Sequence, residues 1–194
     1  MKRNLFDAVC GALPEYRIER LTMQNAWKYR EIFFGNQEYY RLTDGRAPTE
    51  EDIQETIEYE AGPGEGTMLP IGFSVRDEPA AFLSLCDGYP GPETLYIGLL
   101  LVNDRMKRRR VGSRIVAGLI DAAHRLSYEE IRLSVLERNA AGRMFWESLG
   151  FGIAKAQKDG NLSMRYALAR REESPLRSCK SLLMKNEKEA GEGI

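Results

Sequence analysis

One segment, TLYIGLLLV from Thr94 to Val102, is apolar at nearly every position. A strand with one face in water alternates apolar and polar residues, so a continuous apolar run of this length predicts a strand that is covered on both faces. We therefore expect this segment at the centre of a sheet. Gly98 interrupts the run, and a glycine within a strand is typical of a bulge or of a place where another group approaches the backbone closely.

A basic run follows this strand. The ten residues RMKRRRVGSR, from Arg105 to Arg114, contain six of the chain's 28 Lys and Arg residues. Apolar residues then recur at helical spacing from Val111 to Leu126,. The run therefore lies at the start of a helix, where unpaired backbone N–H groups and the helix dipole favour an anion. Gly112 would let a ligand come close to the backbone, Ser113 adds a hydroxyl, and the guanidinium groups can hold phosphate oxygens,.

The charge balance bears on whether this run is a nucleic-acid surface. The chain has 28 basic and 29 acidic residues, so its formal net charge is −1. Proteins that bind nucleic acid through their electrostatic field usually carry a basic excess. We therefore expect no nucleic-acid partner, with RNA binding through residues 105–114 as the third hypothesis. Neither the P-loop pattern nor the GxGxxG dinucleotide pattern occurs,.

Length and composition predict an ordinary globular protein with one core. The chain has 194 residues, of which 43% are hydrophobic and 29% charged,. Its three cysteines are widely scattered and no metal-ligand spacing occurs, so we expect reduced thiols and no metal. Asp7 interrupts the amino-terminal apolar stretch, which argues against a signal peptide,. The longest apolar run, Ile97 to Val102, is far shorter than the roughly 20 residues that span a membrane,. We expect a cytoplasmic protein without a membrane partner.

The other elements predict a mixed domain. In chain order they are a strand at 16–21, helical segments at 23–34 and 48–60, a hairpin at 68–75 and 80–85, a strand at 129–136, a helix that Asn139 caps and Gly150 ends, and a closing hairpin that turns at Asp159 and Gly160,. This order predicts an α+β or α/β domain with a mixed sheet over residues 1–169. Residues 170–194 form a polar tail, flexible or docked, in which Leu182 to Met184 could bind a second copy and make a homodimer,.

Two segments carry a resemblance to a known family. YIGLLLVNDRMKRRRVGSRIVAGLI resembles the acyl-CoA-binding segment of the GNAT superfamily of N-acetyltransferases, in which a strand leads to a loop of the form Gln/Arg-x-x-Gly-x-Gly/Ala and a helix. NAAGRMFWESLGF is similar to the second motif of that family, Asn-x-x-Ala-x-x-Phe/Leu-Tyr-x-x-x-Gly-Phe. The resemblance covers roughly residues 15–169. It implies an α+β fold in which a mixed, mostly antiparallel sheet of about seven strands is flanked by about four helices.

The resemblance also implies the co-substrate, acetyl-CoA, and the residues that hold it. Lys107 stands at the Gln/Arg position of the loop, Gly112 at its last glycine, and Arg110 replaces its first glycine. A bulge near Gly98 would open a V-shaped slot for the thioester. Backbone amides would bind the pyrophosphate, Arg side chains the 3′-phosphate, and the strand the pantetheine arm. The implied cofactor-binding residues are Leu100, Leu101, Val102, Lys107, Arg108, Arg109, Arg110, Val111, Gly112, Ser113 and Asn139.

The implied reaction is transfer of an acetyl group to a primary amine of a small molecule or a protein, by direct attack. Trp146 occupies the position where many relatives have a tyrosine that protonates the departing thiolate. An indole N–H donates a hydrogen bond but is not a useful acid, so packing beside Phe145 is the alternative role for Trp146. A binding module that holds acetyl-CoA with little turnover is therefore the second hypothesis.

Other polar residues are candidates for acid, base or acceptor recognition. The candidates for proton transfer are Tyr96, Glu93, Glu137 and Asp87, each of which also fits an ordinary turn or surface position. In the early helical region, Tyr39, Tyr40 and Asp44 could line an acceptor pocket or serve in packing,. We expect His124 to be structural, because it lies some three helical turns beyond the basic loop.

Overall fold

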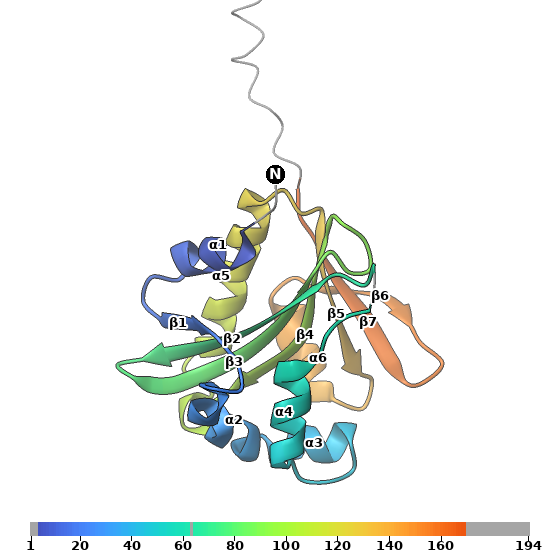
Figure 1. Ribbon diagram of the computed structural model, residues 1–194. Coiled ribbons are helices and arrows are strands. Elements are labelled where there is room, and N and C mark those ends of the chain that lie inside the picture. Colours follow the sequence, from blue (N-terminus) through green and yellow to red (C-terminus); the bar gives the residue numbers. More distant parts are fainter. Residues whose placement is uncertain (1–3, 63, 170–194) are drawn as a thin grey trace, which may run out of the picture.

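The computed structural model describes residues 4–62 and 64–169. Seven strands form one sheet in the order β1-β2-β3-β4-β5-β7-β6 (Figure 1). The strands are β1 (Arg17–Arg20), β2 (Thr67–Val75), β3 (Glu78–Asp87), β4 (Thr94–Val102), β5 (Glu130–Leu136), β6 (Gly152–Ala156) and β7 (Asn161–Ala167). The described helices are α1 (Leu5–Ala12), α2 (Arg30–Gly35), α3 (Gln37–Thr43), α4 (Glu50–Glu58), α5 (Val111–Arg125) and α6 (Ala140–Ser148). The predicted α+β fold with a seven-stranded mixed sheet is confirmed.

The strand pairing places β4 in the middle of the sheet, as its apolar sequence predicts. β4 is parallel to β5, and every other neighbouring pair is antiparallel. The final hairpin does not simply extend the sheet, because β7 inserts between β5 and β6 and leaves β6 at the edge. As a result, β6 and β7 form the right-hand end of the sheet in Figure 1, away from α2, α3 and α4.

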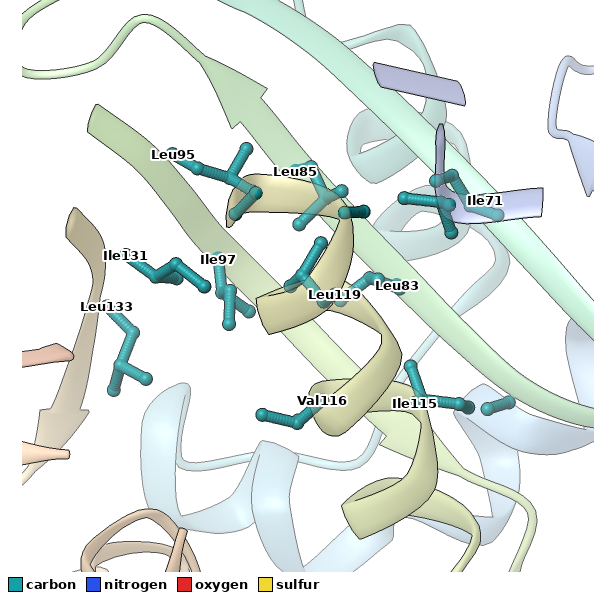
Figure 2. Close-up of a cluster of buried hydrophobic side chains, with 14 of the residues drawn as sticks. Ile71, Leu83, Leu85, Leu95, Ile97, Ile115, Val116, Leu119, Ile131 and Leu133 are labelled. Carbon is teal, nitrogen blue, oxygen red and sulfur yellow. The ribbon is translucent and has the colours of Figure 1, made fainter. Parts of the chain in front are cut away.

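One face of the sheet packs against α5. The stripe of apolar residues predicted for this helix is buried, with Ile115, Val116 and Leu119 at 0% exposure. Figure 2 shows these side chains interleaved with aliphatic residues that come from β2, β3, β4 and β5. Burial of each such side chain contributes on the order of 1.5–3 kcal/mol, so this layer holds β4 and the start of α5 in fixed relation.

The opposite face carries a second, smaller core. Ile32 and Phe33 of α2, Tyr40 of α3 and Ile53 of α4 cluster with Leu101 of β4. The start of α4 has a capping box, in which Thr49 and Asp52 satisfy each other's backbone groups,. Leu101 of β4 therefore belongs to this smaller core, whereas Leu95 and Ile97 belong to the core on the α5 side.

The helices differ from the prediction in number. About four were expected, whereas the described residues contain six α-helices. The amino-terminal residues form α1, which packs on α5 through Leu5, Val9 and Leu13. The helical segment predicted at 23–34 is a 3₁₀ turn at Ala26–Tyr29 followed by α2. The predicted tail, residues 170–194, lies outside the described residues.

Candidate functional site

A bulge interrupts β4 at Gly98. Ser84 of β3 pairs with Leu99 and Leu85 pairs with Ile97, so Gly98 has no partner on β3. Because strand side chains alternate, one extra residue switches every later side chain to the other face. Leu95 and Ile97 point to the α5 side, but Leu99 and Leu101 contact the smaller core formed with α2, α3 and α4. The predicted bulge is confirmed.

β4 also separates from β5 at this point. Its parallel pairing runs from Thr94 opposite Glu130 to Ile97 opposite Leu133, and ends there. Past Ile97, the backbone groups of β4 that face β5 have no strand partner. The expectation that β4 is covered on both faces holds only for its first half, because Gly98 is exposed and Leu99 and Leu100 are half-buried. We call this stretch of β4 without a β5 partner, from Gly98 to Val102, the slot.

The carbonyl of Val102, at the end of this slot, already has a partner. The side chain of Asn36, which is 8% exposed, donates one hydrogen bond to the Val102 oxygen at 3.0 Å and another to the Ile32 oxygen at 2.7 Å. This amide ties the end of α2 to β4. The free backbone groups in the slot are therefore those between Gly98 and Leu101.

The slot leads to the start of α5. Arg110 is the N-cap in the left-handed region, with φ 61°, and makes no side-chain cap. The first intrahelical acceptor is the Arg110 oxygen, which binds the Arg114 N–H at 3.0 Å. The amides of Val111, Gly112 and Ser113 therefore have no helical partner and are available to an anion. A Cβ on Gly112 would lie 3.2 Å from Phe145, so glycine lets the helix start pack closely.

Basic side chains surround these amides. Arg108, Arg109 and Arg110 are exposed, and in the described part of the chain none of them forms an ion pair. Lys107 binds Asp104 at 3.0 Å. Arg108 also has a positive φ of 61°, so the backbone turns sharply twice before the helix begins. Free amides, a helix dipole and unpaired guanidinium groups together suit a polyphosphate.

A cavity of about 360 Å³ lies at the bulge. We call it the Gly98 cavity; its lining includes Tyr59, Glu65, Met68, Cys86, Tyr96 and Gly98. Of these residues, only Tyr96 and Gly98 were predicted from the sequence to lie at the site. Glu65 was not predicted as a site residue, because it stands in a Gly/Pro-rich turn. It is the one carboxylate among the described lining residues. Its side chain accepts a hydrogen bond from the Gly62 N–H at 3.0 Å.

Tyr96 and Cys86 stay protonated in this cavity. Burial, with a smaller effect of Tyr89, raises the pKa of the Tyr96 phenol above 10, and the rings of Tyr89 and Tyr96 meet edge to face at 5.3 Å. Burial likewise raises the pKa of the Cys86 thiol, which donates to the Glu65 carbonyl oxygen at 3.2 Å. At neutral pH Tyr96 can therefore donate a proton but not accept one, and Cys86 is not a thiolate nucleophile.

Trp146 lies in the core. It is 9% exposed and meets Phe145 edge to face at 4.9 Å and Phe151 at 5.2 Å. These contacts agree with the alternative role of Trp146, which is packing beside Phe145. Asn139 caps α6 as predicted, accepting from the Gly142 N–H at 2.9 Å.

The remaining candidates lie away from the Gly98 cavity. Glu93 and Glu137 are exposed, Asp87 accepts a hydrogen bond from Tyr128, and His124 is half-buried on α5. None of these four is among the lining residues.

The three residues proposed for acceptor recognition do not meet at the cavity either. Tyr40 is 4% exposed in the smaller core, and its ring meets that of Tyr39 at 5.4 Å. Burial raises the pKa of Tyr39 to about 12 and raises that of Tyr40 further. Asp44 is exposed. For both tyrosines, the described contacts favour the packing role.

Within 4–62 and 64–169, no group of three or more His, Cys, Asp or Glu side chains is placed to hold a metal ion. In the same part of the chain, no helix is long and apolar enough to cross a membrane.

Known proteins similar to this chain share its architecture. The model of the Acetyltransferase (GNAT) family matches residues 29–151, more than half of the chain. An acetyltransferase from Thermus thermophilus superposes with a TM-score of 0.66 at 19% identity, covering 79% of this chain and 97% of that one. No curated protein matches the sequence.

Two other solved structures have more specific names. The ribosomal-protein-S18-alanine N-acetyltransferase from Escherichia coli has a TM-score of 0.59 at 18% identity, over 82% of this chain and 97% of that one. The PaiA N-acetyltransferase from Thermoplasma acidophilum, solved with coenzyme A, has a TM-score of 0.57 at 15% identity, over 78% and 98%. At these identities the likeness establishes the fold.

Proposed function

The chain belongs to the Acetyltransferase (GNAT) family, and from this premise we propose that it transfers an acetyl group from acetyl-CoA to a primary amine. The observation that carries the proposal is the bulge at Gly98, where β4 leaves β5 and the slot leads along the chain to the free amides of α5. The donor would lie in the slot and the acceptor in the Gly98 cavity.

The residues along the slot fit acetyl-CoA. The amides of Val111 to Ser113 would bind the pyrophosphate, while Arg108 and Arg109 are free to bind the 3′-phosphate,. The backbone from Gly98 to Leu101 would bind the pantetheine arm, and Asn139, at the start of α6, would lie beside it. When bound, acetyl-CoA supplies the acetyl group as a thioester.

The residues of the Gly98 cavity fit an amine. Glu65 offers a carboxylate that can attract an ammonium group and take up its proton,. Tyr96 holds a proton on Oη at neutral pH, because burial raises its pKa, and can donate it to a leaving group. We therefore assign Tyr96, rather than Trp146, as the proton donor.

Among relatives of the same fold are a ribosomal-protein-S18-alanine N-acetyltransferase and a PaiA N-acetyltransferase. Both a protein amino group and a small amine are therefore suitable acceptors to test. The predicted cytoplasmic location and homodimer remain predictions.

A binding module without efficient turnover is the second candidate function. It is favoured by the burial of Trp146 between Phe145 and Phe151, which removes the motif position from proton transfer. In this case acetyl-CoA would bind, but amines would not accelerate release of its thiol.

One experiment separates these functions. Unfolding temperature is measured with and without acetyl-CoA, and thiol release is then followed with a panel of amines and amine-bearing peptides. A rise in the unfolding temperature with acceptor-dependent release supports the enzyme, and a rise without release supports the module. If acetyl-CoA leaves the unfolding temperature unchanged, both proposals are wrong.

A further inference from the structure

A second, larger hollow of about 1100 Å³ lies on the face of β5, β7 and β6 away from α5. We call it the basic hollow; its lining includes Tyr89, Tyr96, Arg132, Lys155, Lys158 and Arg165. Tyr89 and Tyr96 also line the Gly98 cavity. The two spaces therefore share these two side chains as a common border, so a molecule lying in the basic hollow lies next to the Gly98 cavity.

The described lining of the basic hollow carries four cationic side chains and no carboxylate. Arg132 is partly neutralised by Glu130, with its Nε 2.6 Å from the Glu130 Oε1. Within 4–62 and 64–169, Lys155, Lys158 and Arg165 form no ion pair. At least three positive charges therefore remain available to a partner, although the whole chain has a net charge of −1.

The sheet register places two of the four cationic side chains opposite each other. Arg132 of β5 and Arg165 of β7 are direct cross-strand partners, and Arg132 is also opposite Tyr96 of β4. Like charges at directly opposite positions destabilise a sheet. An anionic partner lying across the strands would neutralise this repulsion.

Apolar side chains next to these charges indicate the kind of anion. Tyr89 is 40% exposed and Pro90 is exposed as well, and both line the basic hollow. All five residues of β6 are exposed. Aromatic and aliphatic anchors among charges are typical of a surface that binds a polypeptide, whereas a small anion would need only the charges.

We propose that the acceptor amine is carried by an acidic polypeptide segment that lies in the basic hollow. Its Asp and Glu side chains bind Lys155, Lys158 and Arg165, an apolar residue contacts Pro90, and the amine passes Tyr89 and Tyr96 to reach Gly98. This inference rests on the proposed function for the identity of the reaction, but the binding surface itself can be tested without acetyl-CoA.

The probes are two fluorescent peptides, each with a single lysine. One is rich in Asp and Glu, and the other has the same sequence except that Asn and Gln replace the Asp and Glu residues. Affinity is measured by anisotropy for the wild type, for Lys155→Gln/Arg165→Gln, and for the control Arg17→Gln/Lys28→Gln. The control removes two exposed positive charges from β1 and the following 3₁₀ turn, at the other end of the sheet.

We expect the wild type and the control to bind the acidic peptide roughly tenfold or more tightly than the neutral one, with a preference that falls as salt is added. Lys155→Gln/Arg165→Gln should lose this preference while keeping the rise in unfolding temperature with acetyl-CoA. Equal affinity for both peptides, or an unchanged preference in that variant, would overturn the inference even if acetyl-CoA binds. Tighter binding of an RNA homopolymer than of the acidic peptide to the same residues would also overturn it. Failure of acetyl-CoA to bind would instead overturn the proposed function.

Discussion

Gly118 of α5 lies so close to Leu13 that a Cβ at position 118 would be 2.4 Å from the Leu13 Cγ. Gly118 is buried, whereas Gly11 on the facing α1 has only Arg125 Nη1 near it, at 3.9 Å. We predict that Gly118→Ala lowers the free energy of unfolding by about 1–3 kcal/mol through overpacking. Gly11→Ala should instead raise it by up to about 1 kcal/mol, since alanine favours a helix. Urea unfolding of the two variants measures both effects, and equal signs would contradict this account of the α1–α5 contact.

Arg110 offers a second test, because it has a left-handed backbone where the family motif has glycine. Arg110→Gly should raise the free energy of unfolding by about 1 kcal/mol, since glycine adopts a positive φ without steric cost. Arg109→Gly is the matched control: Arg109 is not among the residues with positive φ, so the same substitution should not stabilise there. We expect Arg110→Gly to retain acetyl-CoA affinity within about threefold, because the amides of α5 remain in place. A tenfold or greater loss, measured by calorimetry, would show that the guanidinium itself binds phosphate.

Asp52 predicts a pH dependence of stability. The Arg46 guanidinium, with both nitrogens 2.7 Å from the carboxylate, lowers the pKa of Asp52 to about 2 from the ordinary 3.8, and the Thr49 amide adds to this effect. Since the folded-state pKa lies below the unfolded value, the unfolded chain takes up the proton first as pH falls. The stabilisation is therefore complete above about pH 5 and is lost as the pH falls from about 4 towards 2.

The measurement is urea unfolding of the wild type and Asp52→Asn across this range. The wild type should be the more stable near neutral pH, and its advantage should shrink as the pH falls below about 4. Glu51→Gln, an exposed acid in the same helical turn, should change the profile much less. Parallel profiles for the wild type and Asp52→Asn would contradict the assigned role of the Arg46 pair.

Tyr96 tests the assignment of the proton donor. Tyr96→Phe keeps the ring but removes the hydroxyl whose pKa burial raises. We expect acceptor-dependent thiol release to fall by about 10²-fold with an unchanged acetyl-CoA effect on unfolding temperature. Tyr89→Phe is the control, because Tyr89 lines the same cavity and contacts the Tyr96 ring at 5.3 Å. A similar loss in both variants would point to packing of the pair rather than to proton donation.

Local sequence patterns predicted several features of the fold. The continuous apolar run predicted the central position of β4, Gly98 the bulge, Asn139 the cap of α6, and Asp159–Gly160 the final turn. Each of these depends on a few neighbouring residues. The amides at the start of α5 followed in the same way from a helix that begins in a basic loop.

Features that depend on distant contacts were not predicted. The helix α1 is short, and its apolar face is explained only by α5, more than a hundred residues later. Glu65 and Cys86 meet at the Gly98 cavity because β2, β3 and β4 bring them there. The pairing of Arg132 with Arg165 required β7 to insert between β5 and β6, which the hairpin sequence alone does not determine.

The bulge at Gly98 makes the slot a matter of counting residues. If Gly98 were paired within the ladder like its neighbours, β4 would alternate without interruption, and Leu99 and Leu101 would replace Leu100 and Val102 on the α5 side,. Both sets are aliphatic, so either register would give an apolar core. The aliphatic side chains therefore do not select the register. The residue that stays unpaired at position 98 does so, and the opening proposed for the donor depends on that one residue remaining outside the ladder.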